Sequence, residues 1–312
     1  MRSRRLEAAT VVQDVKTGAL VVFASSQSAD FDVSTLILPL SVSKVFLAAS
    51  WWDHHQPEST FETNGSANAS NPAYRNRVNS NEMLVGGSDL AGRQMAVQLR
   101  KAVGEEAVLA DLHRYGFNTT DEPFWAYLDP AWRSILTPPP ASARLQNLDN
   151  QQWGAALSIG ETHMTVTLLQ VSRFMQAVGN DGVVCSPVAI RSAPESRAVG
   201  EHCIAAKRII KKSTARRLQT AFLDTVKRGS ASQIADAFNG TGWSIGGKTG
   251  TGGRPGVPLD QQDGIFAGVI FDRQGNARFT VATFVRGGGV GGGNAAEISA
   301  ALGRFLANQG HH

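Results

Sequence analysis

Ser41-Val-Ser-Lys44 places two chemically useful groups within one short stretch of this chain. The hydroxyl and the amine stand three residues apart, so a helix that starts at Ser41 carries both on one face. A base must remove the serine proton before the oxygen can attack, and an apolar helix lowers the pKa of a lysine towards that task. The helix N-terminus also offers N–H groups to an oxyanion. We predict Ser41 as a nucleophile and Lys44 as its base; the alternative is a capping serine followed by a lysine.

The second motif, Gly246-Gly247-Lys248-Thr249-Gly250-Thr251, lies within a predicted strand. Glycines weaken a strand interior, so they indicate that another backbone or a ligand approaches closely. Lys248, Thr249 and Thr251 offer one cation and two hydroxyls to a carboxylate, and an exposed strand edge can pair with an extended peptide. Lys16-Thr17-Gly18 repeats the tripeptide without the preceding glycines, and we predict that it forms only a hairpin turn.

Strands from both ends of the chain must position these motifs. Alternating apolar residues and turn residues predict a hairpin at the start, three strands near the end and helices between them. Such an order implies a sheet closed from distant segments with an all-helical lobe inserted into it. Residues 56–82 and 118–150 lack periodicity and are predicted to be irregular. The predicted strands cover 8–12, 19–24, 243–251, 265–271 and 279–285, and the predicted helices cover 41–52, 90–103, 105–115, 167–179, 211–227 and a closing helix that Asn294 and Glu297 cap.

Composition limits the class of protein. The chain has 312 residues, of which 42% are hydrophobic, enough for a sizeable core in one or two domains. Its 32 glycines follow no three-residue period, which excludes a collagen-like repeat. A net charge of +4 fits an anionic substrate but is too small to indicate nucleic acid. Two cysteines, Cys185 and Cys203, fit one loop-closing disulfide as well as two free thiols.

The order of the motifs resembles the penicillin-binding protein and serine β-lactamase superfamily. S-x-x-K comes first, K-T-G lies on a late strand, and a hairpin, a glycine loop and an amphipathic helix follow. The resemblance covers nearly the whole chain and implies an α+β fold, with a mainly antiparallel sheet flanked by helices and an inserted all-helical lobe. It predicts one domain over 1–312, with the sheet lobe at about 6–40 and 230–310 and the helical lobe at about 41–229. Further matching segments are Thr10–Ser25, Leu157–Glu161, Gly229–Ala231 and Gly287–Ala296.

The resemblance implies an acyl-serine enzyme, a D,D-transpeptidase or D,D-carboxypeptidase that acts on the stem peptides of peptidoglycan and is inhibited by β-lactams. Ser41 would be acylated, Lys44 would activate it, and the backbone N–H groups of Ser41 and Thr251 would form the oxyanion hole. No metal, other cofactor or nucleic acid is implied. The residues that would bind the substrate carboxylate and backbone are Lys248, Thr249, Gly250 and Thr251.

The family's middle motif, S-x-N, is where this sequence departs from the pattern. One register gives Ser88-Asp89-Leu90, in which Ser88 relays a proton between Lys44 and the leaving group or simply caps the next helix. Counting back from Val103-Gly104 gives Ala91-Gly92-Arg93, which contains no relay hydroxyl. Reduced activity is therefore part of the prediction.

Two other functions stay open. A class D-like β-lactamase would carboxylate its lysine, and its second motif ends in an apolar residue, as Ser88-Asp89-Leu90 does. A non-catalytic sensor or scaffold would keep the fold without turnover. The class A motif E-x-x-L-N does not occur in the chain. We expect an extracytoplasmic protein, attached to a membrane only through a segment absent from this sequence, and that location favours a disulfide between Cys185 and Cys203.

Overall fold

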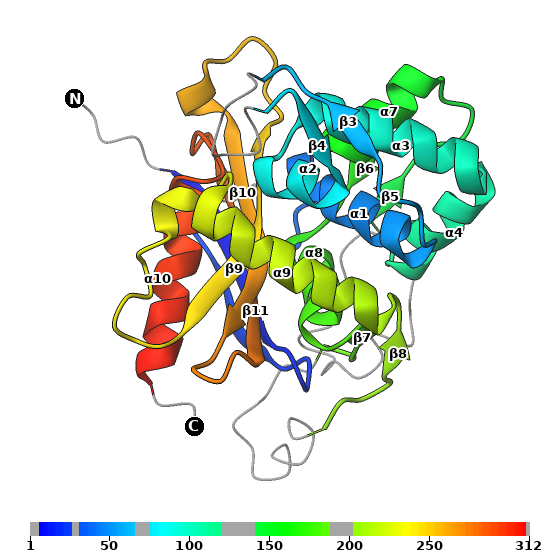
Figure 1. The fold of residues 1–312 in the computed structure, drawn as a ribbon. Helices are drawn as coiled ribbons and strands as arrows, with labels where there is room; N and C mark the ends of the chain where they lie inside the picture. The colour runs from blue at the N-terminus through cyan, green and yellow to red at the C-terminus, as the bar shows by residue number, and fades with distance from the viewer. Residues whose placement is uncertain (1–5, 27–30, 66–74, 120–140, 188–201, 310–312) are drawn as a thin grey trace.

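A five-stranded antiparallel sheet with the order β2-β1-β11-β10-β9 forms the centre of the protein (Figure 1). The computed structural model describes residues 6–26, 31–65, 75–119, 141–187 and 202–309. The first two strands and the last three share one sheet, which confirms the predicted closure from distant segments. Its strands are β1 (Glu7–Asp14), β2 (Leu20–Ser25), β9 (Ser244–Gly252), β10 (Asp263–Phe271) and β11 (Ala277–Arg286).

The central strand β11 contributes to two hydrophobic cores, one on each face of the sheet. Ala282 and Phe284 belong to the larger core, whereas Val281 and Val285 belong to the smaller one. This alternation follows from the two-residue period of a strand. Helix α10 (Asn294–Asn308) covers the smaller core, and the larger core continues into the remaining helices (Figure 1).

Helices α8 and α9 lie between the sheet and the other helices (Figure 1). The Thr167/Gln170 capping box predicted at the start of α8 is present. The division into lobes at residues 41 and 229 stays a prediction. The helices of this part are α1 (Ser43–Asp53), α2 (Ser80–Gly86), α3 (Asp89–Val103), α4 (Glu105–Arg114), α7 (Asn150–Ile159), α8 (Leu168–Gly179) and α9 (Lys212–Arg228). The two-stranded pairs are β3 (Thr60–Glu62) with β4 (Arg77–Asn79), β5 (Ser142–Ala143) with β6 (Met164–Thr165), and β7 (Val183–Val184) with β8 (Lys207–Arg208).

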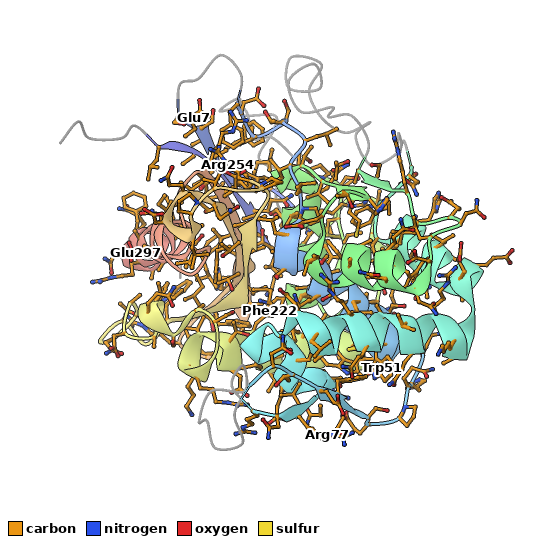
Figure 2. The ribbon with its side chains drawn as sticks, turned by 90° about the horizontal axis from the view of Figure 1, so that it is seen from above. Glu7, Trp51, Arg77, Phe222, Arg254 and Glu297 are labelled. Atoms are coloured by element: carbon orange, nitrogen blue, oxygen red, sulfur yellow. A yellow bond between two sulfur atoms is a disulfide. The ribbon has the colours of Figure 1, made fainter. Side chains whose placement is uncertain are left out.

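Helix α1 is buried along its whole length, as its apolar sequence predicts. Trp51, labelled within the helical part in Figure 2, packs its ring edge-to-face against Phe61 at a centroid distance of 5.6 Å. No helix in the described part of the chain has the length and apolar character to span a membrane.

The prediction of an irregular segment over 56–82 is wrong where the structure describes it. Strands β3 and β4 pair there, and α2 begins at Ser80 behind a capping box formed by Asn79 and Glu82. Each of these two strands buries one apolar residue, Phe61 in β3 and Val78 in β4, and one such residue in three is too few to form a periodic pattern. Residues 66–74 lie outside the described part.

One further helix lies outside the predicted ones, and one predicted cap is wrong. No helix is predicted over 150–159, where the first turn, Asn150-Gln-Gln152, is polar; α7 forms there, and Asp149 caps it. The closing helix has Gly293 at its N-cap, and the Asn294 amide donates to the Gly288 carbonyl at 2.6 Å rather than capping the helix with Glu297.

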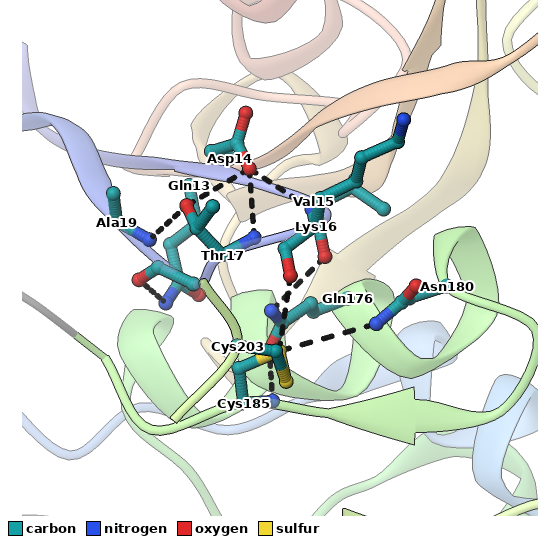
Figure 3. Close-up of a disulfide and its surroundings, with 11 residues drawn as sticks. Gln13, Asp14, Val15, Lys16, Thr17, Ala19, Gln176, Asn180, Cys185 and Cys203 are labelled. Carbon is teal, nitrogen blue, oxygen red and sulfur yellow. Dashed lines mark hydrogen bonds between the residues drawn. A yellow bond between two sulfur atoms is a disulfide. The ribbon is translucent and has the colours of Figure 1, made fainter. Parts of the chain in front are cut away.

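A disulfide joins Cys185, just after β7, to Cys203, just before β8 (Figure 3). Both cysteines of the chain therefore belong to one disulfide, and neither is the free thiol that the sequence also allowed. The Cys185 N–H donates to the side chain of Gln176 at 3.0 Å, and Gln176 donates in turn to the Val15 carbonyl at 3.1 Å. The bonded loop is thereby tied to α8 and to the first hairpin.

Lys16-Thr17-Gly18 forms the turn of that first hairpin, as predicted (Figure 3). The Asp14 carboxylate accepts hydrogen bonds from the N–H groups of Lys16 and Thr17, and Gly18 adopts a left-handed backbone with φ of 78°. This copy of the tripeptide has a structural role in the turn.

Candidate active site

The two motifs meet where the short helical turn η1 (Leu40–Val42) packs against β9. Gly250 permits this contact, because a Cβ at that position would lie 2.9 Å from the Leu40 Cβ and 3.1 Å from the Ser41 nitrogen. The backbone of Ser41 therefore lies directly beside the strand that carries Lys248 and Thr251. The two N–H groups predicted for an oxyanion hole come from these neighbouring segments.

Leu40 fixes the turn that presents Ser41. Its backbone is left-handed (φ of 52°), a strained conformation for a branched residue, and its buried side chain holds it in place. Gly160, which ends α7, packs on this turn so closely that a Cβ there would be 2.8 Å from the Leu40 nitrogen. The helix expected to start at Ser41 thus begins as one 3-10 turn, and α1 proper starts at Ser43.

Lys44 is fully buried, and its ammonium has three hydrogen-bond acceptors. Nζ donates to Ser41 Oγ at 2.9 Å, to Asp89 Oδ1 at 2.6 Å and to the Ser158 carbonyl at 2.8 Å. The contact with Ser41 is the one that the three-residue spacing predicts. Burial lowers the pKa of Lys44, and the nearby charge of Asp89 partly opposes that effect.

Lys248 is the second buried amine of the site. Its Nζ donates to the Thr249 carbonyl at 2.9 Å and lies 3.5 Å from Ser230 Oγ, whose hydroxyl shares a 2.7 Å hydrogen bond with Thr249 Oγ1. Burial and the charge of Lys44 lower the pKa of Lys248 to about 7. A bound carboxylate would stabilise the ammonium form of such a lysine.

The glycine loop after β11 closes on the end of β9. The Gly291 N–H donates to Thr251 Oγ1 at 2.8 Å, so this hydroxyl keeps its own proton to donate to a ligand. Thr251 is only partly buried, unlike Lys248 and Thr249. The loop therefore orients the one hydroxyl of the motif that is accessible at the surface.

The glycine pair before Lys248 allows a close backbone approach, as predicted. A Cβ at Gly246 would lie 2.7 Å from the Leu223 nitrogen, and one at Gly247 would lie 2.5 Å from the ring of Phe266. Helix α9 packs into this space, and its Phe222 side chain is buried in the middle of the molecule, where Figure 2 labels it. Gly246 thus serves packing against α9, and Gly247 serves packing against β10, rather than a ligand.

Ser88 is the N-cap of α3, and its Oγ accepts a hydrogen bond from the Ala91 N–H at 3.3 Å. This is the capping role that the sequence offered as the alternative to a proton relay. Asp89, the next residue, contacts Lys44 instead. In the second register, Gly92 packs against Ser158 and the Lys44 side chain, which leaves no room there for a larger residue.

Gly87 stands on the other side of Ser88 and faces Lys248. A Cβ on Gly87 would lie 3.2 Å from Lys248 Nζ. Gly87 and Asp89 therefore both face the buried lysines, whereas Ser88 between them caps the helix. The geometry matches the spacing of S-x-N in a register that the sequence interpretation did not consider, with Gly87 at the hydroxyl position and Asp89 at the amide position.

A cavity of about 600 Å³ adjoins the site at the end of β9. It extends from Thr251 along the segment that follows the strand, where Arg254 is paired with Asp263 at 2.6 Å. Its size fits an extended peptide or a drug-sized molecule. The lining residues are Leu38, Glu161, Thr162, Thr251, Gly252, Gly253, Arg254, Pro255, Gly256, Leu259 and Gln262.

The sequence interpretation gave no role to three residues that the structure places in the site. Ser158 and Ser230 lie in segments that carried the family resemblance, and this was the available signal for them. Asp89 enters the sequence prediction only as the neighbour of Ser88. A carboxylate next to a motif serine, in a chain with two motif lysines, was the signal that could have identified it.

Comparisons with known proteins agree with this fold. The sequence matches the penicillin-binding protein transpeptidase domain over residues 8–303. It is 27% identical over 274 residues to penicillin-binding protein PbpB of Mycolicibacterium smegmatis, covering 77% of this chain and 39% of that protein. This chain therefore corresponds to about two fifths of the length of that relative.

Solved structures show the same fold at low sequence identity. The D,D-transpeptidase domain of a peptidoglycan glycosyltransferase from Eggerthella lenta has a TM-score of 0.75 at 21% identity, covering 98% of this chain and 79% of that one. Penicillin-binding protein A from M. tuberculosis, solved as an acyl-enzyme complex with ceftriaxone, has a TM-score of 0.73 at 17% identity, covering 97% of this chain and 74% of that one. The chain belongs to the penicillin-binding protein transpeptidase domain family.

Proposed function

We propose that this domain is a serine acyl-transferase of the D,D-transpeptidase or D,D-carboxypeptidase type, which acts on peptidoglycan stem peptides outside the cytoplasm and is acylated by β-lactams. The observation that carries the proposal is the hydrogen bond from Lys44 Nζ to Ser41 Oγ beside the Lys248–Thr251 strand. Nucleophile, base and carboxylate-binding groups therefore lie next to one another, where the Ser41 turn packs against β9. The disulfide supports an extracytoplasmic location.

Acylation would start when neutral Lys44 takes the Ser41 proton while Oγ attacks the carbonyl of the D-Ala-D-Ala bond. The N–H groups of Ser41 and Thr251 would stabilise the oxyanion, and Lys248 and Thr251 would bind the terminal carboxylate. Collapse of the intermediate breaks the C–N bond, and the leaving amine takes up a proton. An acceptor amine, or water in a carboxypeptidase, then releases the acyl group from Ser41.

The surroundings of Lys44 weigh against the class D-like β-lactamase. Carboxylation requires space for carbon dioxide beside the amine, whereas Lys44 Nζ is fully buried and already in contact with three oxygen acceptors. A non-catalytic scaffold is the remaining alternative. It predicts that no covalent adduct forms.

Intact-mass measurement after incubation with benzylpenicillin tests the proposal. We expect a stable adduct on the wild-type protein and none on Ser41→Ala, while Ser43→Ala, one residue into α1, keeps the adduct. Peptide mapping should place the added mass on Ser41. Rapid turnover of nitrocefin without a lasting adduct would favour the β-lactamase, and the absence of both adduct and turnover would favour the scaffold.

A further inference from the structure

Asp89 is a charged residue at the position that faces Lys44, where the family motif S-x-N has an uncharged amide. Its Oδ1 lies 2.6 Å from Lys44 Nζ, while 59% of its side chain stays accessible to solvent. An Asn could accept the same hydrogen bond without a negative charge. The difference between the two residues is therefore electrostatic and acts on the amine that must accept the Ser41 proton.

Three charged groups surround Lys44. Asp89, at the start of α3, favours the ammonium form, whereas Arg93 on the same helix and Lys248 on β9 disfavour it. Helix α7 contributes only the Ser158 carbonyl, which accepts a hydrogen bond from the ammonium. Asp89 is thus the only carboxylate in contact with Lys44 among the described residues.

The loop before Ser88 presents no hydroxyl to the second lysine. Gly87 faces Lys248 with no side chain, so among the described residues Lys248 has only the Thr249 carbonyl and the more distant Ser230 hydroxyl as acceptors. Without a hydroxyl at position 87, no side chain of this loop connects the two amines. The carboxylate of Asp89 therefore contacts Lys44, and its charge acts on Lys248 only from a distance.

We propose that Asp89 is a positioning residue that holds Lys44 as an ammonium in the resting enzyme and so restrains the acylation of Ser41 at neutral pH. The inference rests on the proposed function, because it assigns Lys44 as the base. Ser41 can transfer its proton only to a neutral amine, so the ammonium must first lose one proton.

The test is the pH profile of acylation by a fluorescent penicillin, measured on the wild type, Asp89→Asn and Asp89→Ala. Asn keeps the hydrogen bond and removes the charge, so we expect the rising limb of its profile to move down by about one pH unit, since a contacting opposite charge shifts a pKa by roughly 1–3 units. Acylation at pH 7 then becomes about tenfold faster. Asp89→Ala also loses the hydrogen bond and is expected to be slower than Asp89→Asn at every pH.

The matched control is Asp224→Asn, which neutralises a carboxylate in the surface pair with Arg228 on α9. Its profile is expected to superimpose on that of the wild type. An Asp89→Asn profile that also superimposes on the wild type overturns the proposal. The proposal is also overturned if Asp89→Asn loses as much acylation activity as Asp89→Ala, because acylation would then require the carboxylate instead of being restrained by it.

A second measurement separates this inference from the proposed function. In protein labelled with ¹³Cε-lysine, NMR titration follows the ionisation of Lys44, assigned by Lys44→Arg, without any substrate. We expect Lys44 to ionise at lower pH in Asp89→Asn than in the wild type. If no variant reacts with penicillin but the titration shifts, the proposed function fails while the ion-pair control of Lys44 stands; an unshifted titration refutes that control directly.

Discussion

Ser230 and Thr249 share a hydrogen bond of 2.7 Å between their hydroxyl groups, which ties the segment after α9 to the middle of β9. The same Ser230 oxygen lies 3.5 Å from Lys248 Nζ. One side chain therefore orients both the threonine and the lysine of the K-T-G motif. It does so from a position 18 residues before Lys248, which no local pattern would connect to it.

Replacing Ser230 by Ala is expected to slow acylation roughly tenfold, because one hydrogen bond is worth about 0.5–1.5 kcal/mol and Lys248 loses an acceptor. The measurement is the acylation rate with a fluorescent penicillin. Ser142→Ala is the matched control, since it removes a hydroxyl pair of 2.9 Å with Thr165 on the small β5–β6 sheet. Equal rates for the two variants would show that Ser230 does not orient the motif.

Gly250→Ala should abolish rapid acylation while the protein stays folded. The added methyl group would lie 2.9 Å from the Leu40 Cβ and 3.1 Å from the Ser41 nitrogen, closer than such atoms approach, so the Ser41 turn must move away from β9. A shift of about 1 Å at a reacting group can cost roughly 100-fold in rate.

Gly275→Ala serves as its control. Gly275 occupies an open turn with φ of 78°, so the methyl group meets no neighbour but costs about 1–2 kcal/mol of backbone strain. We expect Gly275→Ala to lower Tm and leave acylation unchanged. If Gly250→Ala is acylated as fast as Gly275→Ala, the close packing of Ser41 on β9 is not needed for the reaction.

The scaffold could be predicted from the sequence where its signals are local. The hairpin at the start, the capping box of α8 and the three late strands follow from apolar periods, caps and turns, and the structure contains them. Helix α7 could not be recognised, because its first turn is polar and its apolar residues pack through contacts that only the folded chain defines. In α7 the local sequence pattern therefore does not predict a helix, although the folded chain buries its apolar residues.

The residues of the candidate site also differ in how far their contacts could be predicted from the sequence. Ser41 and Lys44 are three residues apart, so a helix alone brings them together. Asp89 and Ser158 reach Lys44 from 45 and 114 residues away, and that meeting depends on the packing of three helices. The second motif shows a related difference: Ser88 has the residue type of the motif, but its side chain caps α3, while Gly87 and Asp89 on either side of it face the two lysines.

The titration of Lys248 gives a prediction about stability. Its pKa is about 7 in the folded chain and about 10.4 in an unfolded one. Below pH 7 both states hold the proton and the folded state bears the cost of a buried charge. Between pH 7 and 10 only the unfolded state holds it, so the free energy of unfolding rises with pH over that window.

Lys248→Met removes this contribution. We expect its Tm to exceed that of the wild type at pH 6 and to rise less between pH 7 and 10. Lys101→Met, which changes an exposed lysine on α3, should keep the wild-type dependence. A Lys248→Met curve that runs parallel to the wild type across this window would show that Lys248 is not buried as an ammonium at low pH.

Replacement of Ser88 separates its two possible roles. As the N-cap of α3 it accepts from the Ala91 N–H, so Ser88→Ala should cost about 1 kcal/mol of stability and leave the acylation rate nearly unchanged. Ser88→Asn keeps a capping side chain but carries no hydroxyl, and it should recover the stability. Denaturant unfolding and the penicillin acylation rate, measured on both variants, give the two readouts. A proton relay through Ser88 predicts instead that both variants lose roughly two to four orders of magnitude in rate, with Asn no better than Ala.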